Sequence, residues 1–322
     1  MPFVTQAASP SQPPPHTGGI PDGVEIEEVV TGTGGGRSLH AEIARLKDPP
    51  KVPRPAVLFI HGGSWSARSH KESWSGDPDP RTFEWLFLAS HGYFVASIEY
   101  RLSGEAKWPA QIEDCKLGVR WMRANVSKYN VDPGRIACWG GSAGAHLAAC
   151  LGTMDQPEYE GHGGHEGVSS RVQAVIDYCG PVDFTSGTFA NGSTTIPEEN
   201  KAKVVAMLNA LFGATFAEKP ELWMAASPIT HVRPGHPPFL VVHGERDEVV
   251  SLAQATTFAA TLRRAGVPVE LQIVKGLGHD FEPIWQGWPN APVTDPTATG
   301  LRAEIVDFLE RSLKAPAARA GR

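Results

Sequence analysis

The chain has 322 residues, 41% of them hydrophobic and 20% charged, which is typical of globular proteins rather than disordered or membrane chains. Its formal net charge of −6 includes no basic run, so neither nucleic acid nor an anionic membrane is favoured as a partner. The length suits one domain, which we expect over residues 20–314.

Both ends of the chain are expected to be flexible. Residues 1–19 are rich in Pro, Ser and Gln, a composition that buries little apolar surface, and residues 315–322 form the C-terminal tail. We find neither a secretory signal nor an apolar run long enough to cross a bilayer. The sequence therefore predicts a cytoplasmic protein, with secretion from a longer precursor left open.

The four cysteines show no metal-ligand spacing and lie in apolar segments: Cys115, Cys138, Cys150 and Cys179. This pattern favours buried, reduced thiols over a disulfide framework, and we expect no metal site.

Apolar and polar residues alternate over 24–30 and 38–46, around a glycine-rich turn at 31–36. This pattern predicts a hairpin at the edge of a sheet. The continuous apolar run 56–60 predicts a central parallel strand, covered on both faces. Strands are then expected over 93–99, 135–139, 172–178, 238–243 and 267–274, and helices over 110–128, 143–152, 252–265 and 301–313.

This alternation of strands and helices predicts an α/β fold with a mostly parallel central sheet and helices on both faces. Two stretches interrupt it, at about 155–171 and 184–224, the second with a helix near 202–211. Because insertions on such a scaffold usually lie above the carboxyl ends of the strands, we expect a small cap or pocket wall there.

The strongest chemical signal is Gly-Gly-Ser-Ala-Gly at 140–144, which follows an expected strand and precedes an expected helix. A G-x-S-x-G nucleophile turn requires that context. Gly140 and Gly144 leave room for the sharp reversal, and Ser142 is therefore the candidate nucleophile. An idle serine in a glycine-rich turn is the alternative, since the short motif arises often by chance.

A neutral serine needs a base within reach and an acid that orients that base, in the chain order serine, acid, histidine. Asp247 follows one late expected strand and His279 lies in a glycine-containing loop after the last one, so they are the candidate acid and base. The alternatives are a helix N-cap for Asp247 and an exposed loop position for His279. Three nearby carboxylates rank below Asp247: Glu245, Glu248 and Asp280.

The third element is a run at the carboxyl end of the expected strand 56–60, made of His61, Gly62, Gly63, Ser64 and Trp65. We expect an oxyanion hole formed by the amides of Gly63, Ser64 and Ala143, each worth about 3 kcal/mol in the transition state. His61 is expected to bond the backbone of its own loop rather than to act as a second base.

With these residues in this order, the chain resembles α/β-hydrolase serine esterases over about residues 40–314, especially the hormone-sensitive-lipase-like and BD-FAE-like carboxylesterases. Stretches at 98–102, 108–114 and 227–232 look more like the second group. The resemblance implies hydrolysis of short-chain or aryl esters, without a cofactor, on a small-molecule substrate. Some members release acetyl or feruloyl groups from plant polysaccharide.

Three departures leave the subgroup open. Ser64 stands where the lipase-like motif has a third glycine, Ala145 where GxSAGG ends in glycine, and Ser251 where the acid loop often has proline. The HGGxW pattern also occurs in kynurenine formamidases, so an amide or formamide substrate stays open. A non-catalytic binding protein on the same fold is a further alternative, and a homodimer is undecided.

Aromatic side chains near the expected catalytic loops are candidates for a substrate pocket, with ordinary core packing as an equal alternative. They are Trp65, Trp108, Trp223, Phe281, Trp285 and Trp288. The proline-rich loop 282–298 is the stronger candidate for specificity.

Overall fold

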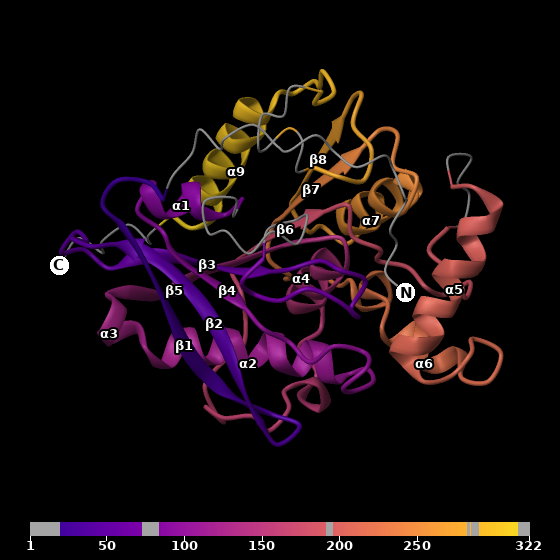
Figure 1. The fold of residues 1–322 in the computed structure, drawn as a ribbon, viewed down its shortest axis with the longest axis horizontal. Coiled ribbons are helices and arrows are strands. Elements are labelled where there is room, and N and C mark those ends of the chain that lie inside the picture. Colours follow the sequence, from indigo (N-terminus) through magenta and orange to yellow (C-terminus); the bar gives the residue numbers. More distant parts are fainter. Residues whose placement is uncertain (1–19, 73–83, 191–195, 282–283, 285–289, 315–322) are drawn as a thin grey trace.

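The computed structural model describes residues 20–72, 84–190, 196–281, 284 and 290–314. The two expected flexible ends, together with Trp285 and Trp288, lie outside the described residues. An eight-stranded sheet runs through the molecule in the order β1-β2-β4-β3-β5-β6-β7-β8 (Figure 1). The strands are β1 (Val24–Gly34), β2 (Arg37–Leu46), β3 (Arg54–Ile60), β4 (Phe94–Ile98), β5 (Val131–Gly141), β6 (Ala174–Tyr178), β7 (Phe239–Gly244) and β8 (Val269–Val274).

The strand pairing confirms the expected edge hairpin and central parallel strand. β1 and β2 pair antiparallel at one edge, and β4, β3, β5, β6, β7 and β8 pair parallel. On β3, Leu58 faces one core cluster and Phe59 faces the other, and both side chains are buried. Burial on both faces explains why this strand is a continuous apolar run rather than an alternating one.

Helices cover both faces of the sheet (Figure 1). They are α1 (Leu86–Ser90), α2 (Ala110–Ala124), α3 (Val126–Tyr129), α4 (Ala143–Thr153), α5 (Glu198–Phe212), α6 (Pro220–Ala225), α7 (Leu252–Arg264) and α9 (Ala298–Ser312). Side chains of α2, α4 and α7 share one core cluster, and those of α1 and α9 share the other. The helix expected over 110–128 is divided at Asn125, whose side chain donates to the carbonyl of Trp121 and ends α2.

The insertion at 155–171 does not lie where we expected it. It follows α4, which runs back from the carboxyl ends of the strands, so it starts at the opposite edge of the sheet. It then packs outside α2, where Glu160 pairs with Lys116 and Arg120. With these residues it lines a cavity of about 790 Å³ that includes no member of the expected triad. The segment therefore starts away from the carboxyl ends of the strands, because its starting point is set by the end of α4, and a cap role for it stays a prediction.

The insertion at 184–224 follows β6 directly and lies near the carboxyl ends of the strands, as expected. Its helix α5 packs against the loop before α2, where the amide of Trp108 donates to the carbonyl of Leu211 at 3.1 Å. Lys107 Nζ also donates to the carbonyl of Ala210 at 2.7 Å. These contacts join the insertion to the loop that precedes α2.

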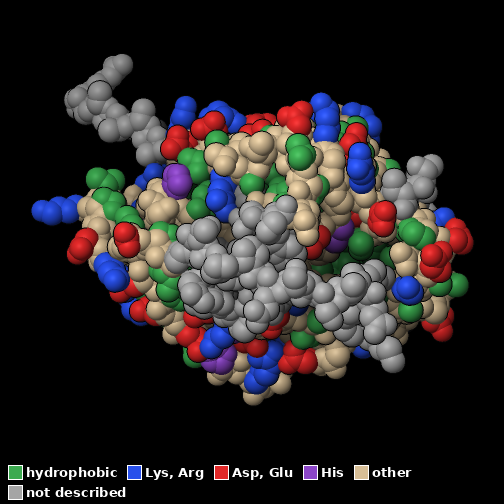
Figure 2. All heavy atoms as spheres, turned by 45° about the horizontal axis from the view of Figure 1, so that its top comes forward, with side chains coloured by type: hydrophobic (Ala, Val, Ile, Leu, Met, Phe, Trp, Pro, Cys, Tyr) green, Lys and Arg blue, Asp and Glu red, His purple; other side chains and the backbone are tan. Residues whose placement is uncertain are grey.

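Acidic and basic side chains are interspersed on the face of the molecule that Figure 2 shows. Among the residues with a described position, no helix combines the length and apolar character that spanning a bilayer requires. All four cysteines are buried and unpaired with one another, as expected.

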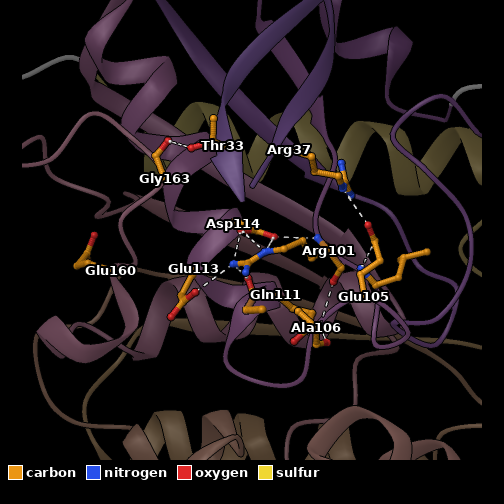
Figure 3. A network of polar contacts seen from close by, with 12 residues as sticks. Thr33, Arg37, Arg101, Glu105, Ala106, Gln111, Glu113, Asp114, Glu160 and Gly163 are labelled. Carbon is orange, nitrogen blue, oxygen red and sulfur yellow. Dashed lines mark hydrogen bonds and ion pairs between the residues drawn. The ribbon is translucent and has the colours of Figure 1, made fainter. Parts of the chain in front are cut away.

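An ion pair between Arg101 and Asp114 fixes the loop after β4 to the N-terminal part of α2 (Figure 3). Asp114 is 3% exposed and accepts from the Arg101 amide, Nε and Nη2, each at 2.8 Å. Glu113 adds a bond to Nη2 at 3.1 Å, and Gln111 Nε2 donates to the Arg101 carbonyl at 3.0 Å. Bidentate geometry of this kind orients both elements and fixes the loop at the carboxyl end of β4 against α2.

Candidate active site

Ser142 occupies the sharp turn between β5 and α4, with φ 53° and ψ −119°. A Cβ on Gly140 would lie 2.2 Å from the carbonyl oxygen of Gly144, and a Cβ on Gly144 would lie 2.0 Å from that of Ile60. Only glycine fits at either position, which is why the chain can reverse here. The amide of Ser142 donates to the carbonyl of Tyr178 at 2.8 Å and ties the turn to β6.

The structure brings the three expected triad side chains together. Nδ1 of His279 lies 2.8 Å from Oδ2 of Asp247, and Nε2 lies 3.0 Å from Oγ of Ser142. Because an ionised carboxylate only accepts hydrogen bonds, the proton is on Nδ1 and Nε2 accepts from the serine hydroxyl. This arrangement allows His279 to take the serine proton while Asp247 stabilises the resulting imidazolium.

Asp247 is buried in a site that favours its ionised form. Its Oδ1 accepts from the amides of Val249 and Val250, both at 2.8 Å. Burial opposes ionisation, but the charge of His279 and hydrogen bonds from His243 and His279 outweigh it and hold the pKa of Asp247 below its ordinary range. Asp247 is therefore ionised at neutral pH and can stabilise the protonated form of His279.

The alternative roles for the acid loop do not fit this geometry. Ser251 is the N-cap of α7, and its Oγ accepts from the amide of Ala253, so Asp247 does not cap that helix. The three competing carboxylates are all exposed: Glu245, Glu248 and Asp280. The carboxylate that lies 2.8 Å from His279 Nδ1 is that of Asp247.

His279 is largely buried, with 17% of its side chain exposed. Burial alone would lower its pKa, but the adjacent Asp247 charge raises it, and the pKa of His279 lies well above that of an ordinary histidine. The site thus contains a strengthened base in contact with a serine.

The expected oxyanion loop lies against the nucleophile turn. A Cβ on Gly62 would lie 3.6 Å from the Cβ of Ser142. The backbone of this loop has positive φ at three successive residues: 94° at Gly63, 56° at Ser64 and 56° at Trp65. The loop amides therefore do not point in the alternating directions of a β-strand. Within the described ranges, the amides of Gly63, Ser64 and Ala143 have no intramolecular acceptor. They are available to a developing oxyanion.

The sequence did not identify Tyr100 as part of this loop. Its hydroxyl donates to the carbonyls of His61 and Gly62, at 3.1 and 3.2 Å, and its ring stacks on His61 at 4.3 Å. His61 Nδ1 lies 2.9 Å from the Gly62 carbonyl, the backbone contact that we expected. Burial lowers the pKa of His61 to about 3, so the ring is neutral. Both side chains hold the loop carbonyls away from the site.

His243 was also not identified, although it lies only four residues before the acid. It is fully buried at the end of β7, and its Nε2 lies 3.2 Å from Oδ2 of Asp247 and 3.0 Å from the Val250 carbonyl. A histidine directly after an apolar strand, in the run His-Gly-Glu-Arg-Asp, is the signal that could have found it. It gives the acid a second donor.

The candidate pocket aromatics within the described residues are at most 5% exposed: Trp65, Trp108, Trp223 and Phe281. Trp223 packs on Phe212 inside the insertion, and its Nε1 donates to the Ala214 carbonyl. Phe281 packs on Tyr178 at 4.9 Å. Their packing roles are clear, and contact with substrate stays a prediction.

One group of possible metal ligands lies among the described residues. Ligand atoms of Cys179, Asp247 and His279 lie within 4.8 Å of one another. A metal ion there would have to replace the 2.8 Å hydrogen bond between Asp247 and His279, which orients the base.

Known proteins are similar to this chain in sequence. Residues 45–262 match the BD-FAE family model. Esterase LipC of Mycobacterium tuberculosis (strain ATCC 25618 / H37Rv) is 34% identical over 245 residues, which cover 75% of this chain and 56% of LipC. Esterase LipQ of the same strain is 33% identical over 236 residues, covering 72% and 51%. The chain spans about half the length of these curated relatives.

Solved structures show the same α/β-hydrolase fold. A truncated form of carbohydrate esterase from gut microbiota has a TM-score of 0.73 and 26% identity, covering 93% of this chain and all of that one. The esterase Est2 of Thermogutta terrifontis has a TM-score of 0.65 and 24% identity, covering 93% and 96%.

Proposed function

Because the chain belongs to the BD-FAE family, we propose that it is a serine carboxylesterase that hydrolyses short-chain or aryl carboxylic esters through an acyl-enzyme. One observation carries the proposal: a hydrogen-bonded path leads from the buried carboxylate of Asp247 through His279 to Ser142 Oγ, with steps of 2.8 and 3.0 Å. The esterase names of LipC and LipQ support the same reaction class.

The proposed reaction begins when Ser142 Oγ attacks the ester carbonyl and His279 Nε2 takes its proton. The negative charge that develops on the carbonyl oxygen is stabilised by the amides of Gly63, Ser64 and Ala143. His279 then gives its proton to the leaving alcohol, which leaves an acyl group on Ser142. Water attacks this ester by the same route and releases the carboxylic acid.

The proposed partner is a small-molecule ester. Among such esters, acyl groups on sugars are the narrower candidate substrate. The chain's similarity to a carbohydrate esterase, which extends over the full length of that structure, supports this choice. An amide or formamide substrate would use the same three side chains, so it is tested as the competing activity.

The test is a rate comparison on p-nitrophenyl esters of increasing acyl length, acetylated sugars and matched anilides and formanilides. We expect ester hydrolysis with a burst of alcohol product, and loss of hydrolysis in Ser142→Ala. The matched control is Ser90→Ala, an exposed serine on α1 whose Oγ bonds the local Phe87 carbonyl and His91. Ester hydrolysis that survives in Ser142→Ala would refute the proposal, and faster cleavage of the anilides would assign an amidase.

A further inference from the structure

The oxyanion loop adopts a conformation that its own sequence does not favour. Ser64 and Trp65 both have φ of 56°, in the left-handed region, where a non-glycine residue is disfavoured by about 1–2 kcal/mol. Such a conformation persists only where the surroundings hold it. The Trp65 side chain is 1% exposed, and its carbonyl accepts from the amide of Ser103 at 2.7 Å, so Trp65 is where the loop is held.

The indole of Trp65 is bonded to a buried histidine. Its Nε1 donates to Nδ1 of His146 at 3.2 Å, and Nε2 of His146 lies 2.8 Å from the carbonyl oxygen of Ala226. An indole nitrogen only donates and a carbonyl oxygen only accepts, so Nδ1 is the acceptor and Nε2 carries the proton. Both ring nitrogens of the neutral imidazole are used. Burial also lowers the pKa of His146 to about 4.

His146 lies one helical turn after the nucleophile. Its amide donates to the carbonyl of Ser142 at 3.1 Å, so its ring is carried by the helix whose first amide is that of Ala143. The other two expected oxyanion donors, the amides of Gly63 and Ser64, belong to a separate loop, in which Trp65 follows them directly. The His146 ring also packs on Phe184 at 5.2 Å, at the start of the 184–224 insertion. His146 therefore belongs to the helix of one half of the oxyanion hole, bonds the loop of the other half, and contacts the insertion.

We propose that His146 is a positioning residue that holds the two halves of the oxyanion hole together through the Trp65 indole. Through the carbonyl of Ala226, the C-cap of α6, it also couples them to the helix that ends the insertion. The proposal rests on the proposed esterase function. It predicts that the bond to Trp65 matters for turnover, whereas the bond to Ala226 matters for the position of the insertion.

Two substitutions separate the bonds. The side-chain oxygen of His146→Asn lies near the position of Nδ1 and can accept from Trp65, but the side chain is too short for Ala226. The amide nitrogen of His146→Gln reaches the position of Nε2 and can donate to Ala226, but it offers no acceptor at the position of Nδ1. We expect His146→Gln to lower kcat by 10-fold or more with KM changed less than 3-fold, and His146→Asn to keep most of kcat.

Trp65→Phe tests the same bond from the other side, because it keeps an aromatic ring and removes the indole N–H. It should reproduce the loss seen in His146→Gln, and the double variant should lose little more than either single one. The matched control is His231→Gln. His231 Nε2 bonds the neighbouring Ala225 carbonyl at 2.8 Å without contacting Trp65, so kcat should stay within 2-fold of the wild type.

A readout without substrate separates this role from the proposed function. The amides of Ser66 and Ala67 donate to the Gly63 carbonyl, both at 3.0 Å, and report on the loop conformation by hydrogen exchange. Their exchange should accelerate in His146→Gln and Trp65→Phe, but not in His146→Asn or His231→Gln. Unchanged exchange in His146→Gln, or equal loss of kcat in the Asn and Gln variants, would overturn the proposal. A wild-type chain that cleaves no ester would overturn only the esterase function.

Discussion

Nδ1 of His279 and Oδ2 of Asp247 lie 2.8 Å apart, and the carboxylate is fully buried. Burial lowers the pKa of His279, the nearby charge raises it, and the net result is a pKa well above the ordinary value of 6.5. The base must be neutral to accept the proton of Ser142, so activity rises as pH rises through this pKa. We expect the acid limb of kcat/KM against pH to have its midpoint above 6.5. A midpoint below 6.5 would contradict this assignment.

Asp247→Asn removes the charge that raises the pKa of His279. The acid limb should then move to lower pH, because the imidazolium loses its stabilising partner. Turnover at the plateau should fall by about 10³–10⁴-fold, since the amide can also hold the wrong tautomer of the imidazole. The control is Glu248→Gln, an exposed carboxylate one residue away, which should change neither the limb nor the plateau. Steady-state rates across the pH range measure both quantities.

His243 is a second donor to the acid, at 3.2 Å from Oδ2 of Asp247. His243→Leu removes this donor, and since a hydrogen bond to a charged group contributes about 1.5–3 kcal/mol, we expect roughly a tenfold loss of kcat while the bond from His279 remains. His243→Gln, whose side-chain nitrogen can occupy the position of Nε2, should recover most of the loss. Equal kcat in the two variants, measured on folded protein, would argue against a role through this bond.

The fold could be predicted from the sequence where hydrophobic pattern and turn residues agree. The run at β3, the hairpin of β1 and β2, and the glycines around Ser142 each have a local physical cause, and the structure has them as expected. The order of serine, acid and histidine also follows from local signals, because each residue lies in the turn or loop that follows an apolar strand.

The supporting residues of the site could not be predicted in this way. The Tyr100 hydroxyl bonds a backbone carbonyl 39 positions away along the chain, and His146 bonds an indole nitrogen 81 positions away. No local sequence pattern marks either contact. The insertion at 155–171 was misplaced for a similar reason. Its position depends on the length and direction of α4 and on the contact of Glu160 with α2.

The Arg101 and Asp114 pair should contribute strongly to stability. Asp114→Ala leaves a guanidinium that is only 15% exposed without its main partner, although Glu113 stays in contact. Breaking a buried pair from one side costs about 3–5 kcal/mol, and we expect the lower end of this range in urea unfolding. The control is Arg311→Ala, whose partner Glu270 is half exposed, and it should lose less than about 1 kcal/mol. Similar losses in the two variants would contradict the ranking.

Asp177, which the proposed mechanism does not use, should make stability depend on pH. It is buried in β6, where burial raises its pKa to about 7 although its Oδ1 accepts from the Gly180 amide at 2.9 Å. Between about pH 4 and pH 7 the folded chain keeps a proton here that the unfolded chain has lost. The stability from this group is therefore complete below about pH 4 and is lost as pH rises towards 7.

Asp177→Asn keeps the acceptor for the Gly180 amide and removes the ionisation. The variant should gain stability relative to the wild type by up to about 1.4 kcal/mol per pH unit between pH 4 and 7, with a constant difference above pH 7. Urea unfolding at half-unit pH steps measures this difference. The partly exposed Asp183, whose Oδ1 accepts from the Thr185 amide, provides the matched Asp183→Asn control for changing an aspartate to an asparagine. A difference for Asp177→Asn that does not vary with pH would show that the Asp177 carboxyl does not titrate between the two states in this range.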